Sequence, residues 1–234
     1  KKILVIDLDP QGNATTGIGH SNIDGSQKNI YNALNGSESI SNIIQTTQID
    51  NLDIITSNVD LSGLEVETAG DNGRAFLLRD KLSLFLKENS PNYTHVFIDC
   101  PPSLSLLTVM ALVASNSLIV PLQTEFFALE GLTQLVKTIE RVKDNLNSEL
   151  AIRGIILTMY DKRNKLSSQV EKEARDYFKD KVYNTVIPRN VRLSEAPSHG
   201  IPVLIYDKTC PGSKSYLSLT EEFLNQEKIM ESAA

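Results

Sequence analysis

Cysteine is scarce in this chain, and no hydrophobic run is long enough to cross a membrane. Cys100 and Cys210 are the two cysteines, and their spacing does not fit a metal-binding motif. We interpret both as reduced thiols of a cytosolic protein. The histidines at positions 20, 95 and 199 are also scattered, which leaves no candidate for a histidine-ligated metal. No apolar stretch approaches the ~20 residues of a transmembrane helix.

The sequence also contains no glycine-rich loop with the lysine that binds nucleotide phosphates. What it has at the start is an apolar run at residues 3–6 that leads into the letters DLDPQG. A second apolar run, at residues 95–98, leads into Asp99 and two prolines. Both patterns are typical of a buried strand that delivers acids to a turn. Two such strands predict a ligand crevice at one edge of an open α/β sheet.

The composition is that of a globular protein with one sizeable core, with 234 residues of which 41% are hydrophobic and 22% charged. The net charge of −6 argues against a generally basic nucleic-acid binder. Residues 137–192 differ, because they hold 13 Lys and Arg against 8 Asp and Glu. This basic region could face a polyanion, although on charge alone a solvated helix face is the preferred interpretation.

Six short apolar runs predict strands. They lie at residues 3–6, 52–56, 95–98, 118–122, 152–159 and 182–187. Most are continuous rather than alternating, as in a parallel sheet covered on both faces. Apolar spacings of three and four predict helices between them, including 78–85, 129–142, 170–178 and 215–226. We therefore predict one α/β domain over residues 1–234, with a doubly wound, mostly parallel sheet, helices on both faces and a frayed tail at 227–234.

Asp7 and Asp9 are candidates for a Mg²⁺-nucleotide site. Alternation along a strand would send both side chains to one face. Two close carboxylates need a cation, a hydrogen-bond network or a raised pKa. In the functional interpretation one Asp orients a water molecule and the other fixes the turn. Taken alone, the pair is explained as well by an Asp that caps a turn through its own backbone.

Asp99 closes an apolar strand, which is where an acid holds Mg²⁺ directly or through water. Pro101 and Pro102 end that strand, and Ser103 is placed to cap a following helix that runs through Met110. Strand-end aspartates are common, so Asp99 indicates a Mg²⁺ site only in combination with the other motifs of the chain.

Five blocks of sequence follow one another across almost the whole chain. They are IDLDPQGNAT at residues 6–15, IDCPPS at 98–103, PLQTEFFALEG at 121–131, LTMYD at 157–161 and IPRNVRLSEAPS at 187–198. Together they closely resemble the ParA family of partition ATPases, in its Soj-like chromosomal branch. The resemblance implies a fold of the P-loop NTPase type, with ATP and Mg²⁺ as cofactors.

The resemblance also implies roles for single residues. Asp9 matches the acid that positions the attacking water, Asp7 supports it, and Asp99 matches the acid that binds Mg²⁺, through water. The two segments that approach the adenine contain Thr158, Met159, Pro188 and Arg189.

Arg163 and Arg192 match arginines that the Soj-like branch uses for non-sequence-specific DNA binding. Both lie in the basic region at 137–192. Without the family context, each is explained as an ordinary exposed arginine. Contacts of this kind give affinity for phosphates without reading sequence, and they weaken with salt.

The family begins with a strand, a deviant Walker A loop and a helix, and all three would lie before Lys1. Backbone amides and a lysine of that loop hold the phosphates. We therefore expect this chain to be N-terminally incomplete and, as it stands, to bind ATP poorly or not at all. Its missing strand would lie in the middle of the sheet.

The resemblance implies a cytoplasmic, nucleoid-associated ATPase that segregates chromosome or plasmid DNA. ATP would be bound in a homodimer, the dimer would bind non-specific DNA, and a ParB-type partner would stimulate hydrolysis. One alternative is a binding module for a ParB-type protein or DNA that needs no nucleotide. Another is a MinD-type positioning ATPase, but the C-terminal helix lacks the basic amphipathic face that such relatives use, so we expect no membrane contact.

Overall fold

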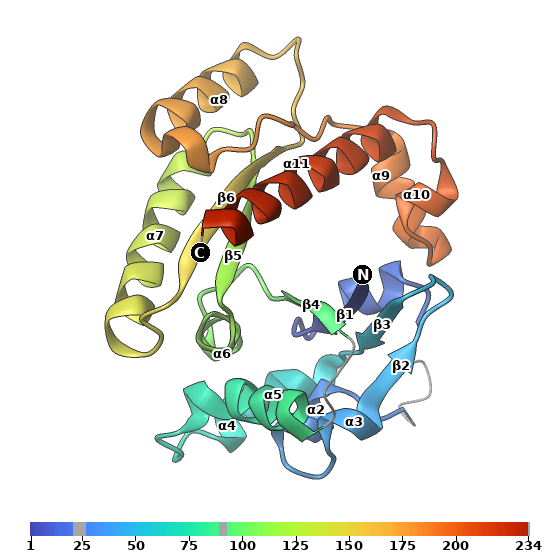
Figure 1. Cartoon of the computed structure of the whole chain (residues 1–234), viewed down its shortest axis with the longest axis vertical. Helices are drawn as coiled ribbons and strands as arrows, with labels where there is room; N and C mark the ends of the chain where they lie inside the picture. Colours follow the sequence, from blue (N-terminus) through green and yellow to red (C-terminus); the bar gives the residue numbers. More distant parts are fainter. Residues whose placement is uncertain (21–26, 89–92, 234) are drawn as a thin grey trace. The chain divides into compact units, whose positions relative to one another are not determined.

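A computed structural model describes residues 1–20, 27–88 and 93–233 of the chain (Figure 1). The chain divides into two compact units. The first unit comprises Lys1–Asn116 and Val142–Leu150, and the second comprises Ser117–Arg141 and Ala151–Ala234. The expectation of a single domain over residues 1–234 stays a prediction.

Most strand pairings in the described part of the chain are parallel. The strands are β1 (Lys2–Asp7), β2 (Ile44–Thr46), β3 (Leu52–Ile55), β4 (Tyr93–Asp99), β5 (Ser117–Gln123) and β6 (Ala151–Thr158). The first unit contains a sheet in the order β2-β3-β1-β4, and the second contains β5 beside β6. Among the strands that the structure describes, β2 and β3 are the one antiparallel pair. The predicted α/β class with a mostly parallel sheet is confirmed, and the described strands form two sheets.

The helices lie between and after these strands. They are α1 (Asn13–Gly17), α2 (Ile30–Leu34), α3 (Ile40–Ile43), α4 (Leu64–Glu67), α5 (Leu77–Glu88), α6 (Leu106–Ala114), α7 (Ala128–Asn145), α8 (Lys165–Phe178), α9 (Val191–Glu195), α10 (Val203–Tyr206) and α11 (Pro211–Ala233). Short 3₁₀ turns cover Val59–Gly63, Arg74–Phe76, Lys179–Lys181 and Ala196–His199. In the described residues, no helix combines the length and the apolar composition that crossing a membrane requires.

The helices predicted from apolar spacing are present as α5, α7, α8 and α11. The helix after Asp99 also forms, as α6, but the prediction that Ser103 caps it is wrong. Its N-cap is Ser105, because the chain bends at Pro102 and Ser103 before the helix begins. Ser103 contributes its carbonyl O instead, which accepts a 2.6 Å hydrogen bond from the Thr108 hydroxyl. The tail predicted to fray is helical through Ala233, and Ala234 lies outside the described residues.

Five of the six predicted strands are present, and the prediction of a strand at 182–187 is wrong. This segment follows β6 only in part, with hydrogen bonds from Tyr183 N and Ile187 N to carbonyls of β6. Between those points, the N–H groups of Asn184 and Thr185 donate to Glu222 of α11, at 2.7 and 2.9 Å. A continuous ladder cannot form because the middle donors are bound to this side chain.

One core lies in the first unit. Leu4 and Ile6 are two residues apart on β1, so they share a face of the sheet. Both are fully buried, and they belong to a cluster with Leu78 of α5 and Met110 of α6. The register between β1 and its neighbours fixes the carboxyl ends of these strands at one edge of the sheet.

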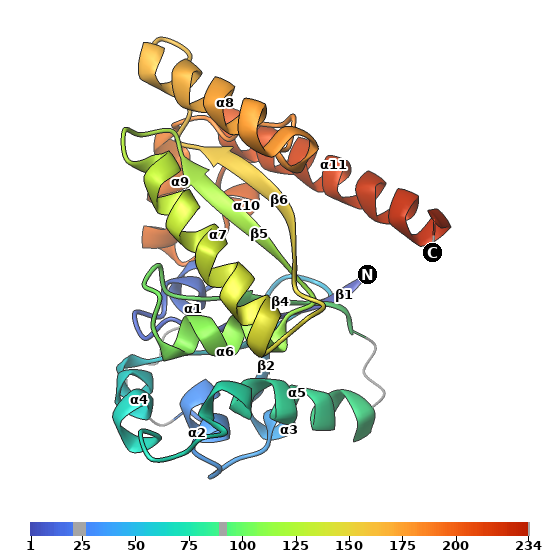
Figure 2. The same ribbon diagram turned by 90° about the vertical axis from the view of Figure 1, so that its left-hand side faces the viewer.

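The sheet of the second unit is covered on both faces. Alternate residues of β6 belong to different cores: Ile155 and Leu157 pack with residues of α7 and α8, and Ile156 packs in a cluster with Leu219 and Phe223 of α11. Figures 1 and 2 show α7 and α11 on opposite sides of β5 and β6. A strand buried on both faces needs apolar residues at successive positions, which explains the continuous apolar run in the sequence.

Gly154 of β6 packs closely against the ring of Tyr183. A Cβ atom built there would lie 2.3 Å from Cε2 of Tyr183, whose side chain is almost completely buried. The ring therefore occupies the volume that any larger residue would need.

We expect Gly154→Ala to lower the free energy of unfolding by about 1–3 kcal/mol, because the buried ring must move to admit a methyl group. Urea denaturation measures the change. Gly131→Ala is the matched control, because Gly131 is helical and has no atom within 4 Å of the added methyl group. That variant should keep or gain stability, by up to ~1 kcal/mol. Equal stability of Gly154→Ala and the wild type would contradict the packing argument.

Candidate nucleotide site and basic surface

The carboxyl ends of β1 and β4 bring three predicted site residues together. Asp7 ends β1, Asp99 ends β4, and the two are partners in the parallel register. The N–H of Leu8 donates to the carbonyl O of Asp99 at 2.7 Å. Asp9 follows two residues after Asp7, beyond the end of the strand. Strand alternation therefore does not fix the direction of the Asp9 side chain, and the position of Asp9 is set by a turn.

Asp7 is fully buried, and its carboxylate is bound by the chain around it. One oxygen accepts hydrogen bonds from both the N–H and the hydroxyl of Thr15, each at 2.7 Å. The other accepts from the N–H of Asp9 at 3.1 Å. Burial raises the pKa of Asp7 above its ordinary value, and the hydrogen bonds from Thr15 oppose that rise. These contacts make Asp7 the anchor of the turn that carries Asp9.

The turn itself is built by Asp9 and Gly12. The Asp9 side chain accepts a hydrogen bond from Gln11 N at 3.0 Å, and its carbonyl accepts from Gly12 N at 2.9 Å. Gly12 has a φ of +65°, in the left-handed region, and a Cβ there would lie 3.4 Å from the carbonyl O of Ser57. Glycine adopts this conformation without strain, and Gly12 thereby allows α1 to begin at the next residue.

Thr15 is a site residue that sequence reasoning did not single out. Its side chain is buried, and its hydroxyl both donates to Asp7 and accepts from the N–H of Ser57 at 3.0 Å. It thereby joins the end of β1 to the segment after β3. The contact between residues 15 and 57 leaves no local pattern in the sequence.

Asp99 differs from Asp7, because much of its surface is open to solvent. The protein atoms that displace water around its carboxyl, followed by repulsion from Asp7 and Asp9, raise its pKa to about 6. The described residues contain no group of three His, Cys, Asp or Glu placed to hold a metal. An accessible carboxylate beside two others nevertheless fits Mg²⁺, which keeps several waters and uses one or two carboxylates together with phosphates.

The predicted adenine segments lie side by side in the second unit. Thr158 ends β6, and the bridge between Tyr160 and Pro188 continues the pairing past the strand. The N–H of Arg189 donates to the carbonyl O of Tyr160 at 3.0 Å. Met159, between them, has a φ of +53°, which is strained for a residue with a side chain.

Thr124 supports this strained segment. Its N–H donates to the carbonyl O of Thr158 at 3.1 Å, and its hydroxyl lies 3.2 Å from the hydroxyl of Ser167 in α8. Both hydroxyl-bearing residues are buried. The structure therefore brings together the four residues predicted near the adenine, and their contact with a nucleotide stays a prediction.

The predicted DNA-contact residue Arg163 is the more exposed of the two. Its side chain is 90% exposed, and Asp161 accepts from its Nε at 3.1 Å and its Nη2 at 2.9 Å. These bonds, together with one from the Arg163 backbone N–H, lower the pKa of Asp161 to about 2. Arg189 lies close to the same acid and also forms an ion pair with Glu125, with 3.8 Å between charged atoms.

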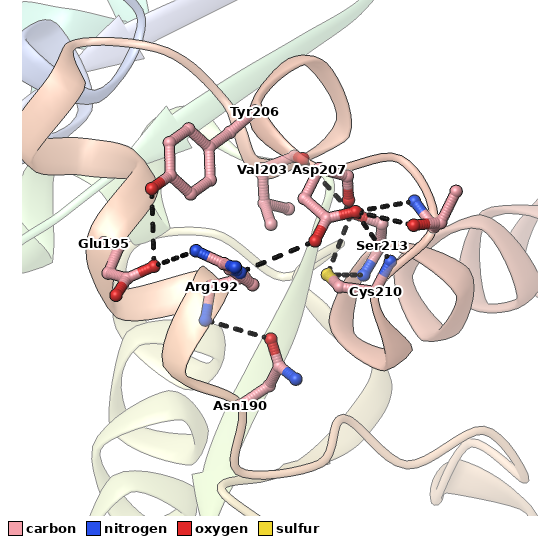
Figure 3. A network of polar contacts seen from close by, with 9 residues as sticks. Asn190, Arg192, Glu195, Val203, Tyr206, Asp207, Cys210 and Ser213 are labelled. Atoms are coloured by element: carbon pink, nitrogen blue, oxygen red, sulfur yellow. Dashed lines mark hydrogen bonds and ion pairs between the residues drawn. The ribbon is translucent and has the colours of Figure 1, made fainter.

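The second predicted DNA-contact residue, Arg192, lies in the polar network of Figure 3. Its Nη1 donates to Glu195 at 2.8 Å, and its Nε lies 3.6 Å from Asp207. Its guanidinium carbon is 5.8 Å from the ring centre of Tyr206, whose hydroxyl donates to Glu195 at 3.3 Å. Asn190 caps α9 by accepting from the N–H of Arg192. Half of the Arg192 side chain remains exposed.

Comparison with solved structures defines the class of protein. Cobyrinic acid a,c-diamide synthase from Mycobacterium smegmatis, with bound ATP analogue and magnesium, matches with a TM-score of 0.83 and 29% identity, over 97% of this chain and 83% of that one. The septum site-determining protein MinD of Pyrococcus horikoshii, complexed with Mg-ADP, matches with a TM-score of 0.73 and 24% identity, over 94% and 82%. The second likeness concerns the fold alone. The fold is that of the P-loop NTPase class.

Comparison with related sequences defines the family. A family model described as AAA domain matches residues 1–152. The chromosome partitioning protein ParA of Caulobacter vibrioides is 50% identical over 234 residues, which are 100% of this chain and 86% of that protein. The sporulation initiation inhibitor protein Soj of Bacillus subtilis is 46% identical over 222 residues, 95% of this chain and 86% of that protein. The chain belongs to the ParA family of chromosome-partitioning ATPases, as its sequence blocks predict.

Asp99→Asn tests the electrostatics of the acidic sheet edge. Because the pKa of Asp99 is raised from 3.8 to about 6, the folded state holds a proton that the unfolded state has released between about pH 4 and pH 6. The contribution of this group to the free energy of unfolding therefore falls as the pH rises through that window. We expect Asp99→Asn to be more stable than the wild type at pH 7.5 and equally stable at pH 4, as measured by urea denaturation without nucleotide or Mg²⁺.

Asp50→Asn is the control for this experiment, because Asp50 is exposed in a turn. It should change stability equally at both pH values. A gain for Asp99→Asn of the same size at pH 4 and pH 7.5 would show that charge repulsion is not its cause.

Proposed function

We propose that this protein hydrolyses ATP in the partitioning of chromosome or plasmid DNA. The observation that carries the proposal is the convergence of Asp7, Asp9 and Asp99 at one edge of the sheet, in a chain of the ParA family. The relative from Treponema pallidum is itself named a chromosome-partitioning ATPase, at 46% identity.

ATP and Mg²⁺ are the proposed cofactors. The magnesium and the ATP analogue in the M. smegmatis synthase support them. When bound, Mg²⁺ would neutralise charge on the phosphates. Asp99 would hold the ion through water, because it is the accessible carboxylate with a raised pKa. Thr158, Met159, Pro188 and Arg189 would approach the adenine.

Asp9 would orient the water that attacks the γ-phosphate. The rigid turn around it supports this role, because Asp7 and Gly12 fix the backbone on both sides of the carboxylate. Catalysis of phosphoryl transfer depends mainly on positioning and on charge stabilisation. A small displacement of this turn would therefore cost much of the rate.

Arg163 and Arg192 would bind DNA phosphates without reading sequence. Their exposure and their place in the basic region at 137–192 support this role. ATP binding would produce a homodimer with a joint basic surface. A ParB-type partner would stimulate hydrolysis and release the dimer from the nucleoid.

Asp9→Ala tests the catalytic role in the full-length protein. We expect ATP turnover to be abolished, because the water loses its orienting group, while nucleotide binding stays largely intact. Phosphate release measures turnover, and a fluorescent ATP analogue measures binding. Asp50→Ala, at an exposed turn, is the control and should keep both activities. Unchanged turnover in Asp9→Ala would exclude the proposed role.

Arg163→Ala and Arg192→Ala test the DNA contact. Each should weaken binding to random-sequence duplex DNA and should reduce the slope of log affinity against log salt by ~1, because one phosphate contact is lost. Fluorescence anisotropy at several salt concentrations measures both quantities. Arg79→Ala is the matched control, because Arg79 is also exposed and paired with an acid but lies in the first unit. Wild-type affinity of both test variants at low salt would refute the assignment.

A further inference from the structure

Arg192 is bound by two carboxylates of its own chain. Glu195 and Asp207 approach its guanidinium from α9 and from the segment between α10 and α11 (Figure 3). A phosphate oxygen would use the same N–H donors that these carboxylates occupy. DNA phosphates and the two carboxylates therefore compete for the same N–H donors of the guanidinium.

The acids are held in place by contacts that do not involve Arg192. One oxygen of Asp207 accepts from the N–H and hydroxyl of Thr209 at 3.0 and 2.9 Å, and from Cys210 N at 3.1 Å. Hydrogen bonds from Thr209 are the main reason that the pKa of Asp207 lies below its ordinary value, and Arg192 contributes least. Glu195 accepts a single hydrogen bond from the hydroxyl of Tyr206, at 3.3 Å. Both negative charges consequently stay beside the arginine when its side chain moves to another anion.

We propose that Glu195 and Asp207 compete with DNA phosphates for Arg192 and thereby limit the affinity of the protein for DNA. This inference rests on the proposed DNA-binding role of Arg192. An ion pair that is half exposed is weak, so a phosphate can displace the carboxylates at small cost. The displaced acids then repel the phosphate, which favours release.

Arg163 is also paired with an acid, but with a single one that its own backbone N–H helps to hold. Asp161 accepts two hydrogen bonds from its guanidinium, which is otherwise open to solvent. Arg175, in the same unit, shows the contrast: its guanidinium donates to the carbonyl O atoms of Tyr183 and Asn184 as well as to a carboxylate. An arginine that binds backbone carbonyls is part of the fold, whereas one whose N–H groups are paired with exposed acids can exchange them for another anion.

Glu195→Gln and Asp207→Asn test the competition, because each removes one charge and keeps a side-chain oxygen. The Asp207 replacement can still accept the hydrogen bonds from Thr209 and Cys210. The measurement is the affinity of the full-length protein for random-sequence duplex DNA, with Mg²⁺ and a non-hydrolysable ATP analogue, at several salt concentrations. We expect each variant to bind about two- to fivefold more tightly, with a steeper salt dependence.

Two control comparisons and a check of folding accompany this measurement. The gain should disappear in an Arg192→Ala background, and Asp80→Asn, which frees Arg79 in the first unit and changes the net charge equally, should leave affinity unchanged. Thermal unfolding confirms that each variant is folded. Should Asp207→Asn fail to fold, Glu195→Gln alone carries the test.

The outcomes separate this inference from the proposed function. Wild-type DNA affinity in Arg192→Ala would remove the DNA contact itself. Weak binding in Arg192→Ala together with unchanged binding in Glu195→Gln would mean that the acids do not compete with DNA, and weaker binding in Glu195→Gln would mean that they orient the arginine. Either result overturns the competition alone. If the tighter binding of the acid variants persists without Arg192, its cause would be general repulsion between acids and phosphates. That result would also overturn the proposal.

Discussion

The architecture around the candidate nucleotide site depends on the buried carboxylate of Asp7. A carboxylate without hydrogen bonds would be very costly to bury, and here three donors from Asp9 and Thr15 offset that cost. The Thr15 hydroxyl extends the network to Ser57, so one side chain connects β1, α1 and the segment after β3. The turn that presents Asp9 is rigid because both of its ends are tied to this network.

The two acids at the carboxyl ends of β1 and β4 lie in different electrostatic surroundings. Asp7 is compensated by hydrogen bonds inside the chain, whereas Asp99 meets partial desolvation and two neighbouring negative charges, and its pKa rises to about 6. The carboxylate that the protein leaves uncompensated is the one that gains most from a cation, because an adjacent positive charge would reverse both the repulsion and the rise in pKa. The partners of the two acids thus distinguish Asp7, which stabilises the turn, from Asp99, the proposed Mg²⁺-binding acid.

Much of the fold was predictable because continuous apolar runs indicate strands covered on both faces. Residues 152–159 fit this rule, since alternate positions of β6 enter different cores. Residues 182–187 are equally apolar, but Glu222 binds two of their N–H groups, and only the folded α11 brings that side chain there. The strand-end acids were predictable for the same local reason, whereas Thr15 was not, because its role arises from a contact with a residue 42 positions away.

The ion pairs of Arg163 and Arg192 show the same division between local and long-range causes. Glu195 lies three residues from Arg192, and Asp161 two residues from Arg163, so each of these pairs can form within a turn. Asp207 reaches Arg192 because α10 lies beside α9 (Figure 1). Ion pairs between exposed side chains contribute little to stability, so breaking one to bind a phosphate costs the fold little. An arginine that is charged, accessible and only weakly held would therefore suit the proposed reversible DNA binding, and a fixed acid beside it would shift the balance toward release.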